Sequence, residues 1–184
     1  MSSNNLRQIL LQKIEEIRKK PEISKTFFTS ETELVGNVKC RAKVRDFNFD
    51  IDEPEALGGD NTAPNPVEYI LAALGSCQEI LYGAYSSVLG IPLESVKVNV
   101  KGTLDLKGLF GLDPDVKPGF GKVSYETYIK SPAEESEIKK LIDTVEKNCP
   151  VLDILSRPIP VEGKVKITGT VNSVNKNKRK EVLA

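Results

Sequence analysis

Two cysteines, Cys77 and Cys149, are the residues of this chain best suited to chemistry. Cys77 is followed by two polar residues inside an apolar stretch, and Cys149 directly precedes a proline. A cysteine thiolate can attack an oxidant, and the sulfenic acid that forms can condense with a second thiol. The alternative is that both are inert, buried side chains, as free cysteines often are. The third cysteine, Cys40, lies on the apolar face of an alternating segment and is predicted to be a core residue.

The chain contains no histidine, which excludes several kinds of site. A Ser-His-Asp triad, a histidine-activated cysteine nucleophile and zinc sites with histidine ligands are all ruled out. Three scattered cysteines are also too few for a zinc cluster or a secreted disulfide framework. We expect no metal and no cofactor. A reactive thiolate would need positive charge nearby, and the candidates are Arg41, Arg45 and Arg157.

The length of 184 residues suits a single domain over residues 1–184. Lys and Arg number 26, as do Asp and Glu, so broad attraction to nucleic acid or to an anionic membrane is not expected. No signal peptide is visible, and Gln78 and Glu79 make the most apolar stretch a poor membrane span. We therefore expect a soluble cytoplasmic protein, with residues 172–184 as a charged, solvated tail.

The stretch 65–83, NPVEYILAALGSCQEILYG, is predicted to form the central helix. Asn65 is a good N-cap, Pro66 suits the first helical position, and Glu68 sits where a capping-box carboxylate reaches back. Almost every side chain in 67–74 is apolar or small, and no polar stripe repeats there at helical spacing. A helix of this kind must be buried on most sides, so other elements are expected to wrap it.

The remaining pattern predicts helices and strands that could position the thiols. The expected elements are an amphipathic helix over 4–20 ended by Pro21, strands over 27–34, 38–44 and 47–51 with a turn at Gly36-Asn37, a loop over 53–64, strands over 96–106 and 123–129 joined by a loop over 108–120, a helix from Ser131 to about Lys147, a short helix over 150–156 with Cys149 at its N-cap, and a last strand over 161–171. This order indicates an α+β fold with antiparallel sheets. The first helix could pack on its own subunit or on a partner; both alternatives stay open.

The motifs NPVEYILAALGSC and, some seventy residues on, NCPVLDILSRPIPV resemble the OsmC/Ohr family of thiol peroxidases. DEPEALGGDNTAPNP and GLDPDVKPGF are similar to the OsmC-like branch of that family. The resemblance covers residues 38–171. It implies an intertwined homodimer in which curved antiparallel sheets wrap a central helix from each subunit, with active sites at the subunit interface.

The resemblance also implies roles for individual residues. Cys77 takes the position of the peroxidatic cysteine that reduces organic hydroperoxides, and Cys149 that of the resolving cysteine. The reductant in such relatives is a dithiol, such as lipoamide carried on a protein. Arg45 or Arg41 would stabilise the Cys77 thiolate, and Glu68 is the candidate for the carboxylate that holds this arginine.

The chain departs from the peroxidase pattern at that carboxylate. In the peroxidase branches a glutamate directly follows Asn-Pro, whereas this chain has Val67 there and Glu68 one position later. One residue along a helix is a turn of about 100°, so Glu68 is expected to point elsewhere, and its capping-box role is an equal alternative. Three functions therefore stay open: reduction of peroxides, binding of a small ligand without catalysis, and sensing of redox state by the thiols.

Overall fold

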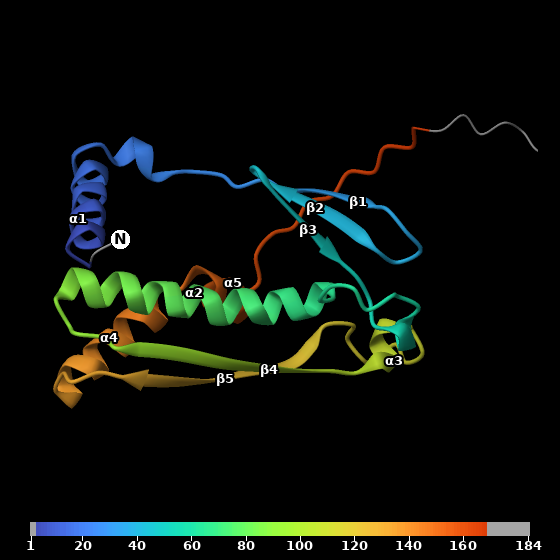
Figure 1. Cartoon of the computed structure of the whole chain (residues 1–184). Coiled ribbons are helices and arrows are strands. Elements are labelled where there is room, and N and C mark those ends of the chain that lie inside the picture. Colours follow the sequence, from blue (N-terminus) through green and yellow to red (C-terminus); the bar gives the residue numbers. More distant parts are fainter. Residues whose placement is uncertain (1–2, 169–184) are drawn as a thin grey trace, which may run out of the picture.

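The structure, a computed structural model, describes residues 3–168 (Figure 1). The elements in chain order are α1 (Ser3–Lys19), the 3-10 helix η1 (Pro21–Ser24), β1 (Glu31–Leu34), β2 (Cys40–Val44), β3 (Phe47–Ile51), the 3-10 helix η2 (Glu55–Leu57), α2 (Pro66–Leu89), β4 (Ser95–Leu104), α3 (Leu106–Leu109), β5 (Phe120–Lys130), α4 (Glu135–Asn148) and α5 (Pro150–Ser156). The predicted α+β class is confirmed.

The strands form two separate antiparallel sheets, one of order β1-β2-β3 and one of β4-β5. Figure 1 shows α2 running between them, with β4 and β5 along one side and the three-stranded sheet on the other. The predicted turn at Gly36-Asn37 joins β1 to β2, whose end residues Leu34 and Cys40 pair. Along β4 and β5 every second residue is half-buried, as expected for strands that cover a helix with one face.

Helix α2 begins as its sequence predicts. The Asn65 side chain accepts a hydrogen bond from the Glu68 N–H at 3.0 Å, and the Glu68 carboxylate accepts one from the Asn65 N–H at 2.8 Å. The helix ends at Gly90, whose φ of 74° lies in the left-handed region that glycine tolerates best. These two signals set the length of the helix that carries Cys77.

The loop before α2 is fastened by a buried carboxylate. The Asp52 side chain accepts hydrogen bonds from the Glu53 N–H and from the N–H and hydroxyl of Thr62. The Thr62 bonds contribute most to lowering the pKa of Asp52. Gly59 packs so closely that a Cβ there would lie 1.9 Å from the carbonyl oxygen of Glu53. The loop therefore delivers the chain to α2 in a defined geometry.

The core lies where α4 packs against α2 and the start of β4. Its buried members are Tyr82, Ile91, Leu141 and Val145. The first helix, α1, contacts α2 of the same chain, which Figure 1 shows as α1 crossing the far end of α2. Within residues 3–168, none of the helices combines the length and the apolar character needed to cross a membrane.

One prediction about α2 is wrong for the single chain: the helix is not buried on most sides. Ile80 is 70% exposed and Ile70 is 40% exposed. The reason is that β4, α4, α5 and α1 contact only part of the helix surface.

Three boundaries also differ from the prediction. Strand β1 begins at Glu31, and residues 25–30 form no strand. Helix α4 begins at Glu135, because the Ser131 hydroxyl donates to the Pro92 carbonyl and accepts from the Ala133 N–H, which fixes a turn before the helix. Residues 161–168 are exposed and form no strand, since none of the strands described within residues 3–168 pairs with them. Residues 169–171 of the predicted last strand, and the predicted tail 172–184, lie outside the described residues.

Candidate active site

The two thiols singled out in the sequence meet where α2 passes the junction of α4 and α5. The Sγ atoms of Cys77 and Cys149 lie 3.5 Å apart. Cys77 is half-buried on α2, whereas Cys149 is 1% exposed. As predicted, Cys149 is the N-cap of α5, and its Sγ accepts from the Leu152 N–H at 3.5 Å. Two helices with separate start signals thus bring the sulfurs into contact.

The protomer alone does not favour the thiolate of Cys77. Burial raises the pKa of Cys77, and the adjacent Cys149 thiol acts in the same direction. The backbone N–H of Val151, at the start of α5, lowers it in part. None of the arginines contributes to the pKa of this thiol within the described residues. A cation from elsewhere would therefore be needed to make the thiolate common at neutral pH.

The candidate arginines are engaged with other groups. Arg41 Nε donates to Asp50 Oδ1 at 3.0 Å, and the Arg45 guanidinium lies 5.0 Å from the centre of the Phe47 ring. Arg157 forms a bidentate ion pair with Asp153 of α5, with hydrogen-bond distances of 2.7 to 2.9 Å. Arg41 lies on β2, and Arg45 lies in the turn between β2 and β3, where its φ is 55°. Figure 1 shows this three-stranded sheet on the side of α2 away from β4 and β5.

Glu68 lies in the capping box, where its carboxylate binds the Asn65 N–H. Val67, at the position where the peroxidase pattern has a glutamate, instead lines an apolar cavity. Because of the one-residue offset, the lining of this cavity contains Val67 and not Glu68.

This apolar cavity of about 450 Å³ lies between α2, α5 and the start of β5, and neither cysteine is in its lining. Val67, Ile70 and Leu74 line it from α2, one turn after another up to the turn that holds Cys77. The opposite walls come from the start of β5 and from α5, with Phe120, Val123, Tyr125, Leu152 and Leu155 among them, and Lys122 is the charged residue of the lining. The cavity can take an apolar molecule. Leu74 and Leu152 of its lining are each three residues from one of the two cysteines.

The sequence did not predict a cluster of polar side chains formed by Gln78, Tyr82, Tyr125 and Glu146. The Tyr125 hydroxyl donates to Glu146 Oε1 at 2.9 Å. Gln78 is 1% exposed, and neither its amide oxygen nor its nitrogen has a partner in hydrogen-bond geometry. Tyr82, one turn along α2, has its pKa raised to about 12 by burial and by Glu146. The available signals were the polar Tyr125 on an inward-facing strand row and the position of Glu146 three residues before Cys149.

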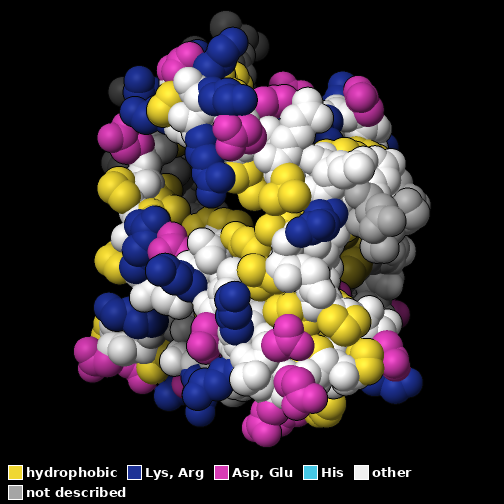
Figure 2. Space-filling model, turned by 90° about the vertical axis from the view of Figure 1, so that its left-hand side faces the viewer, with side chains coloured by type: hydrophobic (Ala, Val, Ile, Leu, Met, Phe, Trp, Pro, Cys, Tyr) yellow, Lys and Arg dark blue, Asp and Glu magenta, His cyan; other side chains and the backbone are white. Residues whose placement is uncertain are grey.

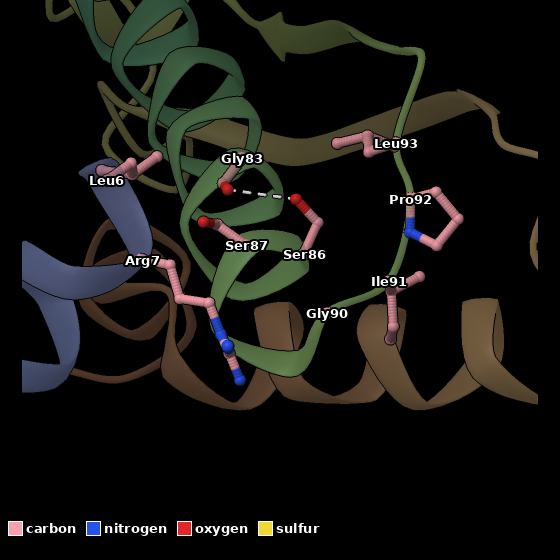
Figure 3. A pocket seen from close by; sticks show the side chains of 9 residues that line it. All are labelled: Leu6, Arg7, Gly83, Ser86, Ser87, Gly90, Ile91, Pro92 and Leu93. Carbon is pink, nitrogen blue, oxygen red and sulfur yellow. Dashed lines mark hydrogen bonds between the residues drawn. The ribbon is translucent and has the colours of Figure 1, made fainter. Parts of the chain in front are cut away.

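A second hollow, of about 640 Å³, lies at the other end of α2, between α1 and the start of β4 (Figure 3). Its lining includes Leu6 and Arg7 from α1 and Leu93 before β4, and Ser86 Oγ donates to the Gly83 carbonyl at 3.0 Å. Figure 2, which views the molecule from the α1 end, shows hydrophobic side chains gathered around a hollow with charges of both signs around them. This hollow holds no cysteine.

No group of three or more Cys, Asp and Glu side chains in residues 3–168 is arranged to hold a metal ion.

A family model described as OsmC-like protein matches residues 59–164, more than half of the 184 residues. The chain belongs to the OsmC-like family. This range includes the loop from Gly59, all of α2 and both thiols of this OsmC-like chain. The resemblance drawn from the sequence motifs is thereby confirmed.

Among curated proteins, the OsmC-like chain is similar to a hydroperoxide reductase from Mycoplasma genitalium. The two are 34% identical over 94 residues, which are 50% of this chain and 61% of that protein. The match therefore spans less than two thirds of that relative's length.

Solved structures share the fold. An OsmC-like protein from Mycoplasma pneumoniae superposes with a TM-score of 0.62 at 22% identity, over 72% of this chain and 89% of that one. An organic hydroperoxide resistance protein OsmC from Legionella pneumophila superposes with a TM-score of 0.54 at 21% identity, over 72% and 90%. The predicted OsmC/Ohr-type fold is confirmed, while the intertwined homodimer stays a prediction.

Proposed function

We propose that this protein reduces organic hydroperoxides, with Cys77 as the peroxidatic and Cys149 as the resolving cysteine. The observation that carries the proposal is the 3.5 Å separation of the two sulfurs. An apolar cavity lined by Leu74 and Leu152, each three residues from one of the cysteines, adds support. Sulfurs this close can form a disulfide with little movement, and the cavity suits the carbon chain of a hydroperoxide.

The reaction takes place in three steps. The Cys77 thiolate attacks the outer oxygen of the hydroperoxide, the O–O bond breaks, and the alkoxide takes up a proton to leave as an alcohol. Cys149 then attacks the sulfur of the Cys77 sulfenic acid, loses its proton, and expels hydroxide, which leaves as water. A dithiol such as protein-bound lipoamide reduces the disulfide by exchange and becomes a cyclic disulfide itself.

The proposed working form is a homodimer. A single chain leaves Ile80 on α2 70% exposed and residues 161–168 without a pairing strand. A second copy could cover both, because large exposed apolar areas mark interfaces. It could also bring Arg45 of its β2–β3 turn, or Arg41 of its β2, to the Cys77 thiolate.

Single serine substitutions test the proposed roles in a stopped-flow assay with cumene hydroperoxide and a dithiol. Cys149→Ser should still consume one equivalent of hydroperoxide and stop as a sulfenic acid that a dimedone probe traps. Cys77→Ser should consume none, and Cys40→Ser should behave as the wild type. Full first-turnover consumption by Cys77→Ser would reverse the roles, and equal behaviour of all variants would exclude the peroxidase.

The second candidate is a ligand-binding or redox-sensing dimer of the same fold. Its support is the raised pKa of Cys77 together with Val67 in place of a cavity-facing glutamate. In that case wild-type protein would bind an apolar probe in the cavity without multiple turnovers of hydroperoxide, even with excess dithiol.

A further inference from the structure

We propose that Cys149, before it resolves the sulfenic acid, holds Cys77 as the reactive thiolate by donating its own thiol hydrogen to the Cys77 sulfur. The inference rests on the proposed function, because it gives the proposed resolving cysteine a second role in the preceding step. The singly ionised pair then carries one negative charge and one proton. This donor inside the same subunit acts in addition to any cation that a partner subunit supplies.

The contact between the two sulfurs is a hydrogen bond from Cys149 to Cys77. The Cys149 Sγ is the donor, the Cys77 Sγ is the acceptor, and 3.5 Å separates them. The Cys149 sulfur itself accepts from the Leu152 N–H at 3.5 Å, which orients it at the N-cap of α5. A thiol has one hydrogen to donate, and Cys149 directs it to Cys77. Because a hydrogen bond to the charged form of a group favours that form, this contact stabilises a thiolate on Cys77.

Burial determines which of the two sulfurs carries the negative charge. Cys149 is 1% exposed, whereas Cys77 is half-buried. Desolvation penalises the charged form more at the more deeply buried sulfur. When one proton remains on the pair, we therefore expect the proton on Cys149 and the charge on Cys77. This distribution places the nucleophile at the sulfur that a small molecule can reach more easily.

The two sulfurs cannot both ionise easily. Two like charges this close repel each other, as in pairs of carboxylates that share one proton. Burial contributes most to raising the pKa of Cys77, the Val151 N–H lowers it, and an ionised Cys149 raises it further. The influence of Cys149 on Cys77 thus changes sign with the Cys149 proton. The protonated thiol favours the Cys77 thiolate, and the Cys149 thiolate opposes it, so the sign can be measured.

Ionisable groups on the elements packed around the pair have partners or surroundings of their own. They are Glu79 and Tyr82 of α2, Tyr125 of β5, Glu146 of α4 and Asp153 of α5. Glu79 binds a backbone N–H of β4, Tyr125 binds Glu146, and Asp153 binds an arginine. Burial raises the pKa of Tyr82 to about 12, so it stays protonated, and the lysines of β4 lie on the exposed face of that strand. Within the described residues, Cys149 is the ionisable side chain that changes the pKa of Cys77.

Two substitutions of Cys149 test this role in the full-length protein. Both are made in a Cys40→Ser parent, so that Cys77 is the thiol that remains. Cys149→Ala removes the donor, whereas Cys149→Ser keeps a hydroxyl donor at the same place. The pH dependence of alkylation by iodoacetamide, followed by peptide mass spectrometry, gives the pKa of Cys77. In Cys149→Ala this pKa should rise by about one unit, and alkylation at pH 7 should slow about tenfold, while Cys149→Ser stays close to the parent.

The direction of the change decides the outcome. A pKa of Cys77 that is lower in Cys149→Ala than in the parent would mean that Cys149 carries the charge, which overturns the proposal. Equal values in Cys149→Ala and Cys149→Ser would overturn it too, because the donated hydrogen would then have no effect. Ser76→Ala is the matched control. The Ser76 hydroxyl is one residue from Cys77 but donates to the Ala72 carbonyl at 2.7 Å, so its loss should leave the pKa of Cys77 unchanged.

Infrared spectroscopy of the Cys40→Ser parent gives an answer even if Cys149→Ala does not fold. At low pH the pair contributes two S–H stretching bands, and Cys77→Ser identifies the band of Cys149. As Cys77 ionises, its band should disappear and the Cys149 band should move to lower frequency, because a hydrogen bond to an anion weakens the S–H bond. A Cys149 band that stays in place, or that disappears first, would contradict the donor role.

These measurements use no hydroperoxide, which separates this proposal from the proposed function. If the wild type reduces no hydroperoxide but Cys149→Ala raises the pKa of Cys77, the peroxidase proposal fails and the donor role stands. If the wild type reduces hydroperoxides but the alkylation profiles of Cys149→Ala and Cys149→Ser coincide, the donor role is wrong and the peroxidase proposal stands.

Discussion

The sulfur atoms of Cys77 and Cys149 lie 3.5 Å apart although 72 residues separate them in the chain. A disulfide bond is about 2.05 Å long, so closure requires an approach of about 1.5 Å. Cys149 stands at the junction of α4 and α5, directly before Pro150, where a small rearrangement disturbs few helical hydrogen bonds. The geometry therefore favours a bond inside one subunit.

The first prediction is that one equivalent of cumene hydroperoxide converts the reduced protein to an intramolecular Cys77–Cys149 disulfide. Cys40 pairs with Ile51 across β2 and β3, on the sheet at the other side of α2, and should stay a free thiol. Differential alkylation followed by peptide mass spectrometry measures both. Cys40→Ser serves as the control and should oxidise in the same way. A disulfide that includes Cys40, or one between subunits, would contradict the prediction.

The second prediction concerns the exposed face of α2. Ile80→Glu should weaken self-association at least a hundredfold, because burying a carboxylate in an apolar interface costs about 3 kcal/mol or more. Sedimentation velocity over micromolar concentrations measures this. Leu112→Glu places the same charge on another exposed apolar residue, in the loop after α3, and is the comparison. A wild-type protein that sediments as a stable monomer would refute the dimer itself.

The third prediction concerns the source of positive charge. Burial raises the pKa of Cys77, so removing a cation supplied across the dimer should raise it further and move the rate profile to higher pH. Arg45→Met should lower the hydroperoxide rate at pH 7 about tenfold. Arg41→Met should lower it less, because Asp50 already holds that guanidinium.

Alkylation rates of Cys77 as a function of pH give the readout for these arginine variants. Arg157→Met is the control, since Arg157, directly after α5, is paired with Asp153 of that helix. Unchanged profiles in Arg41→Met, in Arg45→Met and in the double variant would remove both arginines from the site.

Local signals in the sequence were sufficient for the elements that hold the thiols. The capping box at Asn65 and Glu68 and the N-cap at Cys149 were both predicted from residue types alone, because caps depend on neighbours a few positions away. Contacts between residues far apart in the chain were harder to predict from the sequence. The approach of Cys77 to Cys149 followed only from a family resemblance, since spacing does not determine how distant helices meet.

The errors have a physical origin as well. Residues 161–168 alternate like a strand, but a strand needs a partner edge, and none of the described strands of this chain pairs with them. The apolar character of α2 predicted burial without saying which molecule provides the cover. The Tyr125–Glu146 pair was missed because it joins β5 to α4, and no local pattern encodes that contact.

The last prediction concerns Tyr82, which is 3% exposed in the core between α2 and α4. Burial, with the nearby Glu146, raises its pKa from an ordinary 10.0 to about 12. The folded state thus keeps the phenol proton where the unfolded chain has lost it. The stabilisation is fully present below pH 10 and is lost as the pH rises toward 12, by on the order of 2 kcal/mol.

Tyr82→Phe should remove this part of the pH dependence. Urea unfolding at intervals between pH 9 and 11.5, in the presence of a reductant to keep the thiols free, should show a steep decline in the free energy of unfolding for the wild type. The variant should decline less steeply, because phenylalanine does not titrate. Tyr128→Phe, which changes an exposed phenol bound to Glu126, is the control and should follow the wild type closely. Parallel declines in wild type and Tyr82→Phe would mean that Tyr82 titrates alike in the folded and unfolded chains.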